Sequence, residues 1–202
     1  FLTRDSRFGA LGHGIHDVDT NGLVEIAKGS LYATNIRTLM KGRAGMPGSL
    51  EGIIVYNSFN RLGEIEKNTE AGIYGKLEKV DRLFEEEIAI EVAKKEEICT
   101  GPAQIRCCIG DEICYYDVEI LDVDLTEKEV NKGMIVRVTD PKLLEETGGI
   151  IQGMSGSPIV QNGKLIGAVT HVFVNHPEKG YGIFAETMLE FSGGNFAENQ
   201  TE

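Results

Sequence analysis

Short apolar runs, interrupted every few residues by glycine, proline or asparagine, recur along most of the chain. Such runs are typical of β-strands, because a helix needs an apolar face that repeats over about ten or more residues. Residues 88–93 alternate apolar and polar side chains, which favours a strand, although their charges would also suit a helix face. Hairpin turns are predicted at 110–111 and at 162–163, where asparagine followed by glycine is the strongest signal for a two-residue turn. The strands predicted from these patterns are 23–27, 31–36, 52–57, 88–93, 104–109, 113–121, 134–138 and 168–174.

Three segments carry helical signals instead. Asp140, Pro141 and Gly148 suit the N-cap, the first helical position and the position after the end of a short helix. Residues 126–132 and 186–189 predict single helical turns. Residues 192–202 are polar, and we expect them to be frayed. Many short strands and few helices predict an all-β barrel or sandwich rather than an α/β fold.

Length and charge narrow the class of protein further. The chain has 202 residues, which suits one domain or two small lobes that share a core. The formal net charge of −12 and the pI of about 4.8 argue against nucleic acid or an anionic membrane surface as a partner. No apolar run approaches the ~18 residues that cross a bilayer. Because the chain starts at Phe1 without a signal-peptide pattern, we expect it to be a processed part of a longer precursor.

Four cysteines lie close together, at Cys99, Cys107, Cys108 and Cys114. Their spacing fits no common zinc pattern with paired cysteine knuckles. Cys107 and Cys108 are adjacent, so in a strand they point to opposite faces and do not easily reach one metal. A disulfide between Cys114 and either Cys99 or Cys107 is feasible in an oxidising compartment. Small buried hydrophobes in strands are the interpretation that we favour, with no metal site.

The segment GMSGSP, which begins at Gly153, presents Ser155 in a tight loop of small residues. Glycines allow the backbone to fold so that successive N–H groups converge on one point. Such a point can hold the oxyanion that forms when a serine hydroxyl attacks a carbonyl carbon. The same residues would also make an ordinary surface turn before a hairpin.

A serine nucleophile needs a neighbouring base, and histidine is the usual one because its pKa lies near neutral pH. His13 lies in the small-residue segment GALGHG, where close backbone contacts would position its ring. His16 and His176 have the sequence context of exposed loop residues. His171 lies in an apolar strand, which favours a hydrogen-bonded core histidine, although a supporting role beside a bound substrate stays open.

Two long motifs carry a resemblance to a known family: GALGHGIHDVDT near the start and GMSGSPIVQNGKLIGAVTHVFV near the end. With NTEAGIYG and KGRAGMPGSLEG between them, the chain resembles the SpoIVB peptidases, which are serine peptidases of bacterial sporulation in the chymotrypsin-like clan. The resemblance covers the chain as a single peptidase domain, residues 1–202, apart from the C-terminal tail. It implies an all-β, chymotrypsin-like fold with two β-barrel lobes and a few short helices.

The resemblance also implies roles for individual residues. Ser155 matches the nucleophile, His13 the general base and Asp140 the acid of a catalytic triad. The order His, Asp, Ser along the chain fits a chymotrypsin-like triad. The backbone N–H groups of Gly153 and Ser155 would hold the oxyanion, and Ser157 would be structural. The substrate would lie against Thr170, His171 and Val172.

Two features depart from this pattern. A helix-capping role already explains Asp140. Asp17 and Asp19 are the alternative acids, but they lie too near His13 in sequence to reach its ring easily. Only twelve residues precede His13, so the first lobe is either incomplete or completed by upstream sequence.

The resemblance further implies a peptidase that cuts itself out of a precursor with a membrane anchor and a PDZ domain upstream. It would be secreted from the forespore into the space between the two spore membranes. There it would cleave a membrane-associated regulatory complex and so trigger sigma-factor activation, without a cofactor and without nucleic acid as a partner. A function of another class stays open, namely a catalytically silent, peptidase-like module that binds peptides along the strand 168–174.

Overall fold

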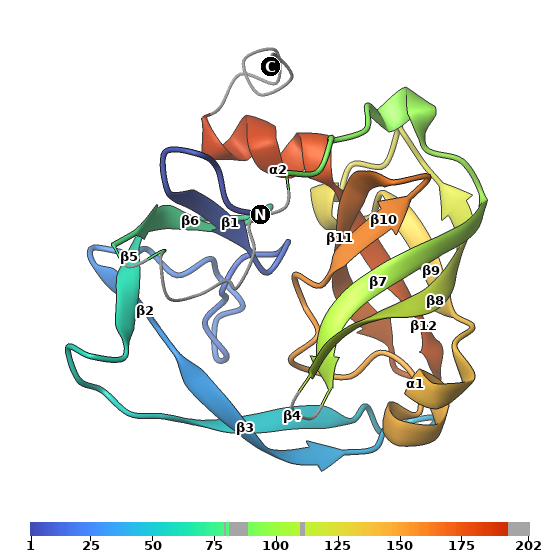
Figure 1. Ribbon diagram of the computed structural model, residues 1–202, viewed down its shortest axis with the longest axis horizontal. Helices are drawn as coiled ribbons and strands as arrows, with labels where there is room; N and C mark the ends of the chain where they lie inside the picture. Colours follow the sequence, from blue (N-terminus) through green and yellow to red (C-terminus); the bar gives the residue numbers. More distant parts are fainter. Residues whose placement is uncertain (79, 81–88, 110–111, 194–202) are drawn as a thin grey trace.

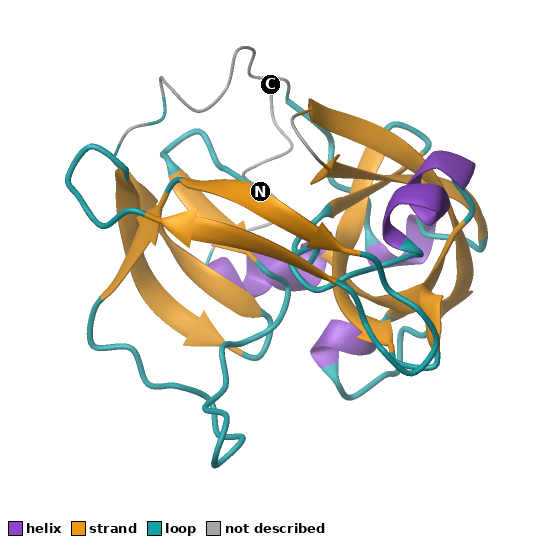
Figure 2. Cartoon of the chain, turned by 90° about the horizontal axis from the view of Figure 1, so that it is seen from below, coloured by secondary structure: helices purple, strands orange, loops and turns teal. Residues whose placement is uncertain are grey.

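The computed structural model describes residues 1–78, 80, 89–109 and 112–193. Its strands form a closed barrel and a smaller N-terminal sheet, with a separate two-stranded hairpin beside them (Figure 1). The hairpin runs from the N-terminal sheet towards the barrel in both views (Figure 1, Figure 2). This hairpin therefore links two parts of the fold that are distant in sequence.

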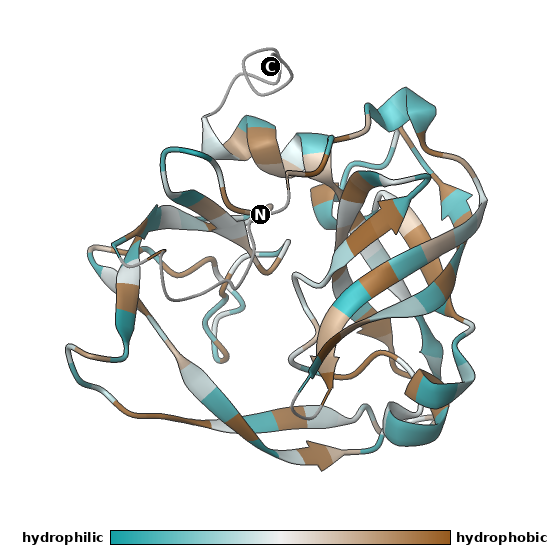
Figure 3. Ribbon diagram, in the orientation of Figure 1, coloured by the Kyte–Doolittle hydropathy of each residue, from teal (hydrophilic) through white to brown (hydrophobic). Residues whose placement is uncertain are grey.

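The barrel comes from the C-terminal half of the chain, and its strands follow the order β10-β11-β12-β9-β8-β7. Along β7, buried and exposed side chains alternate, because a strand directs successive side chains to opposite faces. The bands of hydrophobic and hydrophilic colour along β7 in Figure 3 follow this alternation. Pairing of β10 with β7 closes the barrel. The strand bounds are β7 (Gly101–Ile109), β8 (Glu112–Val123), β9 (Met134–Val138), β10 (Pro158–Gln161), β11 (Lys164–Phe173) and β12 (His176–Phe184).

The barrel interior is apolar. Ile105, Ile159 and Val169 are fully buried there, and Met154 from the loop before β10 joins the same core. Burial of one such side chain contributes roughly 1.5–3 kcal/mol of stability. The core therefore anchors the loop that carries Ser155 through the residue next to it.

The helices are few and short, as the sequence predicts. α1 (Pro141–Thr147) begins at Asp140, whose side chain accepts a hydrogen bond from the Leu143 N–H, and ends at Gly148 with a left-handed φ of 75°. Both features match the capping pattern in the sequence. α2 (Ala185–Ser192) contacts β1, β11 and β12, and the 3-10 turns are η1 (Lys95–Glu97) and η2 (Val130–Lys132). In the described part of the chain, no helix is both long enough and apolar enough to span a bilayer.

The N-terminal sheet has four strands in the order β1-β6-β5-β2, and a small core of Phe8, Ile73 and Leu77 covers it. Over the described residues this sheet is open, unlike the C-terminal barrel. The bounds are β1 (Arg7–Ala10), β2 (Gly29–Tyr32), β5 (Arg61–Thr69) and β6 (Gly72–Leu77), and the hairpin is formed by β3 (Thr34–Met40) and β4 (Ser49–Ile54).

The strand predictions are confirmed for the barrel and fail in two other places. Residues 23–27 form no strand, and only Leu23 makes an isolated bridge. Residues 89–93 are not a strand either, because Val92 alone bridges to β11, while residue 88 lies outside the described residues. The predicted strand 31–36 is divided between β2 and β3. The turn at 110–111 and the tail from 194 also lie outside the described residues.

Candidate active site

The loop that carries Ser155 has a backbone that glycine makes possible. Gly153 has a φ of 100° and Gly156 a φ of 86°, a region in which other residues are strained. The loop is fixed to β11, because the Gly156 N–H donates to the Val169 carbonyl at 2.8 Å. The buried side chain of Met154 fixes it from the other side. The structure thus holds Ser155 on a rigid turn.

The Ser155 hydroxyl donates a hydrogen bond to the backbone carbonyl of Thr170, with 2.9 Å between the oxygens. Thr170 is itself buried, and its hydroxyl donates to the Asn131 carbonyl at 2.7 Å. Ser155 is half-buried, so its hydroxyl lies at the surface of the barrel end. The Ser155 hydroxyl is therefore oriented by β11 in this structure, and not by a histidine.

Two backbone N–H groups of this loop are available to a ligand. Among the described residues, neither the Gly153 N–H nor the Ser155 N–H has a hydrogen-bond partner, whereas the Met154 N–H between them donates to the Ile151 carbonyl. Unpaired N–H groups beside a nucleophile are the donors that an oxyanion hole requires. These two groups are the same ones that the sequence predicts for that role.

His13 follows β1 after a sharp turn in which Leu11 has a φ of 69° and Gly12 a φ of 74°. A left-handed conformation is unusual for leucine, and such strain concentrates at functional sites. A Cβ atom placed on Gly12 would lie 3.0 Å from Thr170 Cγ2. The turn before His13 is therefore pressed against the residue whose carbonyl holds Ser155.

The His13 loop and the Ser155 loop also touch each other directly. A Cβ atom on Gly156 would lie only 2.8 Å from the backbone nitrogen of Leu11. Glycine at position 156 allows the two backbones to approach this closely. The structure thus brings Ser155 and His13 to one place from opposite ends of the sequence.

The ring of His13 has a defined tautomer. Its Nδ1 lies 2.9 Å from the Gly14 carbonyl, and a carbonyl can only accept a hydrogen bond. Nδ1 therefore carries the proton, and Nε2 keeps the lone pair that a general base uses. Among the described residues, no carboxylate forms an ion pair or hydrogen bond with this ring.

His171 lies beside His13, with 4.9 Å between the two ring centroids. Partial burial lowers the pKa of His171, with smaller contributions from the neighbouring His13 and Lys132 side chains, and this favours its neutral form. Its side chain lies at the surface, so the interpretation of His171 as a hydrogen-bonded core residue is wrong. A position beside both His13 and the Ser155 partner suits contact with a substrate.

The backbone near His171 departs from regular pairing. The register of β11 with β12 shifts between Val169 and Val172, so Thr170 and His171 lie in an irregular part of the strand. Irregularities of this kind re-aim side chains next to active sites. Val172 is half-buried at the end of the same segment. The three residues predicted to contact substrate therefore lie together beside Ser155, and their contact with substrate stays a prediction.

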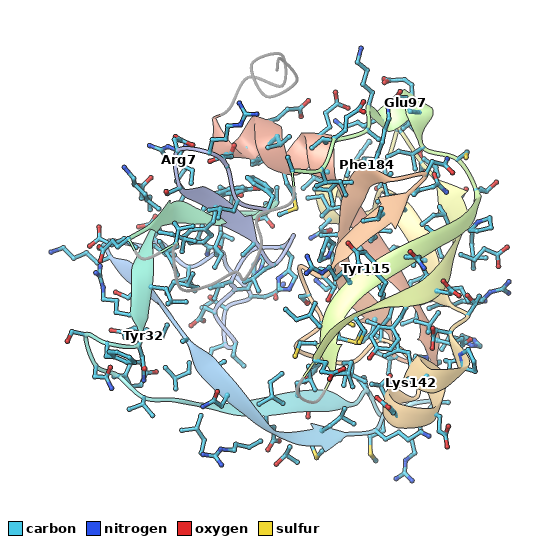
Figure 4. The ribbon with its side chains drawn as sticks, viewed as in Figure 1. Arg7, Tyr32, Glu97, Tyr115, Lys142 and Phe184 are labelled. Carbon is cyan, nitrogen blue, oxygen red and sulfur yellow. The ribbon has the colours of Figure 1, made fainter. Side chains whose placement is uncertain are left out.

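Asp140 is held elsewhere. Its carboxylate accepts from the Leu143 N–H at 3.0 Å and from the Asp117 N–H at 3.3 Å, at the start of α1. Figure 4 shows Lys142, on that helix, at the opposite side of the molecule from Arg7, at the start of β1. The structure thus confirms the helix cap and does not bring Asp140 to the ring of His13. Its role as the acid stays a prediction.

Of the remaining candidates, His16 also reaches the His13 loop, because its Nδ1 lies 3.2 Å from the Gly14 carbonyl. His16 Nε2 lies 3.3 Å from a Glu70 carboxylate oxygen, and His176 Nδ1 lies 3.3 Å from a Glu178 oxygen. Both histidines thus face acidic side chains at the surface. The four cysteines form no disulfide, and burial raises the pKa of Cys107 to about 12. No disulfide joins Cys99 or Cys107 to Cys114.

Sequence reasoning missed the contact between the two loops. The signal was present in Gly12 and Gly156, but a glycine in a small-residue segment does not reveal which backbone approaches it. It also missed the Thr170 carbonyl as the partner of Ser155, because side-chain identity carries no information about a backbone acceptor.

Comparison with known proteins identifies the family. A family model described as SpoIVB peptidase S55 matches residues 1–189. No curated protein matches the sequence. Similar solved structures include the Rv3671c protease from M. tuberculosis in its active form, with a TM-score of 0.43, 13% identity and coverage of 78% of this chain and 80% of that one. The inactive form of the same protease has a TM-score of 0.42 and 14% identity, covering 75% of this chain and 87% of that one.

The TM-scores and identities of these structures are low, so the assignment follows from the family model. The closed six-stranded barrel, the second sheet and the few short helices confirm the predicted all-β fold of a chymotrypsin-like peptidase. Because the family model spans almost the whole chain, the chain belongs to the SpoIVB peptidase S55 family and is a serine peptidase.

Proposed function

We propose that the chain is an endopeptidase in which Ser155 is the nucleophile and His13 is the general base. One observation carries this proposal, namely the direct contact between the Ser155 loop and the His13 loop at Gly156 and Leu11. The free N–H groups of Gly153 and Ser155 support it, since they supply the donors that acyl transfer needs.

In the proposed mechanism, the Ser155 hydroxyl leaves the Thr170 carbonyl and turns towards Nε2 of His13. Oγ then bonds to the scissile carbonyl carbon while Nε2 takes the hydroxyl proton, and the carbonyl oxygen becomes an oxyanion held by two N–H groups. The tetrahedral intermediate collapses as His13 returns the proton to the leaving amine, which leaves an acyl-enzyme on Ser155. Water then attacks the acyl carbon while His13 takes a proton from it. His13 returns this proton to Ser155 Oγ as the acid product leaves.

The family resemblance places Asp140 as the third member of the triad, where it would hold the imidazolium of His13. The structure supports an orientation of His13 that does not need Asp140, because the Gly14 carbonyl already fixes the required tautomer. Movement of Asp140 to the ring would break two hydrogen bonds at the start of α1.

The family membership supports a more specific biological role. In this proposal the peptidase releases itself from a longer precursor that carries a membrane anchor and a PDZ domain. It is secreted from the forespore into the intermembrane space. There it cleaves a membrane-associated regulatory complex, and sigma-factor activation follows.

A precursor extended upstream with its natural sequence provides the test. Ser155→Ala removes the nucleophile, so self-cleavage and hydrolysis of internally quenched peptides should fall by about 10⁶-fold. Ser157→Ala is the matched control from the same loop, and it should cleave at the wild-type rate. Undiminished cleavage in Ser155→Ala would overturn the assignment.

One observation favours a second function, that of a silent peptide-binding module. The Ser155 hydroxyl bonds to the Thr170 carbonyl and not to His13, so the pair is not poised for proton transfer in this structure. A module of this kind would bind the internally quenched peptides with the same affinity in the wild type and in Ser155→Ala, and the wild type would cleave none of them.

A further inference from the structure

Two histidine rings lie side by side near Ser155. The centroids of the His13 and His171 rings are 4.9 Å apart, and the two ring planes are inclined by 41°. His13 comes from the loop after β1, whereas His171 belongs to β11. The N-terminal part of the fold and the barrel therefore each contribute one imidazole to the same place.

Both rings have a nitrogen that can bind a ligand. His13 donates from Nδ1 to the Gly14 carbonyl, which leaves the lone pair of its Nε2 free. In the described part of the chain, the ring of His171 forms no hydrogen bond or ion pair, and its side chain is exposed. Neutral imidazole nitrogens are common ligands of zinc and related transition metals. The two rings are therefore available to a metal ion.

The other two histidines lack this arrangement. His16 Nδ1 lies 3.2 Å from the Gly14 carbonyl, and its Nε2 lies 3.3 Å from a Glu70 carboxylate oxygen. Both nitrogens face oxygen acceptors, so neither offers a lone pair in this arrangement. His176 Nδ1 likewise faces a Glu178 oxygen at 3.3 Å. Neither ring therefore joins another histidine in offering two free nitrogens at one place.

The spacing of the paired rings suits a shared zinc ion. With zinc–nitrogen distances of about 2.0–2.1 Å and a tetrahedral angle at the metal, two imidazole centroids lie about 5 Å apart. The observed 4.9 Å is close to this value. Among the described residues, no group of three or more histidine, cysteine, aspartate or glutamate side chains is placed to hold a metal. Water would complete the coordination, so this site binds zinc more weakly than a closed structural site does.

We infer that His13 and His171 bind one zinc ion between their rings, and that this ion reversibly inhibits the peptidase. Coordination uses the lone pair of His13 Nε2, which takes the proton of the Ser155 hydroxyl in the proposed mechanism. A metal-bound Nε2 cannot accept that proton, so Ser155 is not activated. The inhibition rests on the proposed function, whereas the binding of zinc does not.

The first test measures binding and needs no activity. Accessible thiols are first blocked with iodoacetamide, because cysteines also bind zinc. Calorimetric titration of Ser155→Ala with zinc chloride should show one ion per chain, with a Kd on the order of 1–100 µM. An excess of magnesium chloride should not displace the zinc, because Mg²⁺ prefers oxygen ligands.

Single substitutions in the same background identify the ligands. His171→Gln removes one of the two ligands, so the zinc Kd should rise at least about 10-fold. His16→Gln is the matched control, because its ring also lies beside Gly14, and it should keep the original Kd. Urea unfolding of both variants shows that they are folded. Absence of saturable binding, an unchanged Kd in His171→Gln, or an equal rise in His16→Gln would overturn the inference.

The second test measures hydrolysis of an internally quenched peptide. Zinc should inhibit the wild type with half-inhibition near the measured Kd, and EDTA should restore the rate. His171→Gln, compared with its own zinc-free rate, should need at least about 10-fold more zinc for half-inhibition. Zinc binding without loss of activity would overturn the inhibition. A wild type that binds zinc through His171 and cleaves no peptide would overturn the proposed function and leave the zinc site intact.

Discussion

Replacement of Gly156 by alanine tests whether the contact between the two loops creates the active site. Gly156 has a φ of 86°, so alanine adds roughly 1–2 kcal/mol of backbone strain. Its Cβ would lie 2.8 Å from the Leu11 nitrogen, whereas ordinary contact begins at 3.4 Å. The Leu11 atom is backbone and a Cβ has no torsion by which to move away, so the loops must separate by about 0.6 Å to relieve the overlap. Since a displacement of about 1 Å can cost 10²-fold in rate, we expect kcat/KM to fall at least about 10-fold.

Gly163→Ala is the matched control. Gly163 has a φ of 79°, so the backbone strain is the same, but no atom lies within 4 Å of the added Cβ. Urea unfolding should show a loss of stability in both variants, with the larger loss in Gly156→Ala because the overlap adds to the backbone strain. The kcat/KM for an internally quenched peptide that the wild type cleaves should fall only in Gly156→Ala, once the enzyme concentration is corrected by active-site titration. Equal kcat/KM in the two variants would refute the argument that this contact positions Ser155 and His13.

Three further predictions concern other residues. The family resemblance predicts that Asp140→Asn lowers kcat about 10⁴-fold. Urea unfolding should show a stability loss of only about 1 kcal/mol, since asparagine still caps α1 but loses the bond from the Asp117 N–H; unchanged kcat would leave Asp140 as a capping residue only. Burial raises the pKa of Cys107 to about 12, so iodoacetamide at pH 8 should modify the exposed Cys99 and spare Cys107 until urea unfolds the protein, as mass spectrometry would reveal. The pKa of His171 is lowered from its ordinary value of 6.5, so the unfolded chain binds the proton more readily, and stability falls as the pH drops below about 6.5. Urea unfolding at pH 7.5 and 5.5 should show a smaller acid loss in His171→Asn, and an equal loss in both proteins would contradict the assignment.

The barrel was predictable because its strands are locally specified. The alternation of apolar and polar residues predicts β7 and β8 as strands. The asparagine–glycine turn before β11 also predicts that β11 pairs with β10. The caps of α1 were equally legible at Asp140 and Gly148. The N-terminal sheet was harder, because β1 is only four residues long and takes its partner, β6, from far along the chain. The prediction of a strand at 88–93 was wrong for another reason. Residues 89–93 pack against β11 but join it at a single bridge, so they form no strand ladder.

The candidate site was predictable in its chemistry and not in its geometry. Residue type alone indicates Ser155, His13 and the glycines beside them as candidates. The family motifs then assign a role to each of these positions. The approach of Leu11 to Gly156 and the bond from Ser155 to the Thr170 carbonyl arise from how two sheets pack. Packing of this kind depends on backbone positions that side-chain identity does not encode.

Labelling with a peptidyl diphenyl phosphonate tests the central claim most directly, because the reagent reacts only with a serine that a neighbouring base activates. The account predicts a single phosphonyl adduct on the peptide that contains Ser155, located by fragmentation in the mass spectrometer. The adduct should be absent in Ser155→Ala, strongly reduced in His13→Ala and unchanged in Ser157→Ala. An unlabelled wild-type protein, or an adduct on Ser157, would contradict the account.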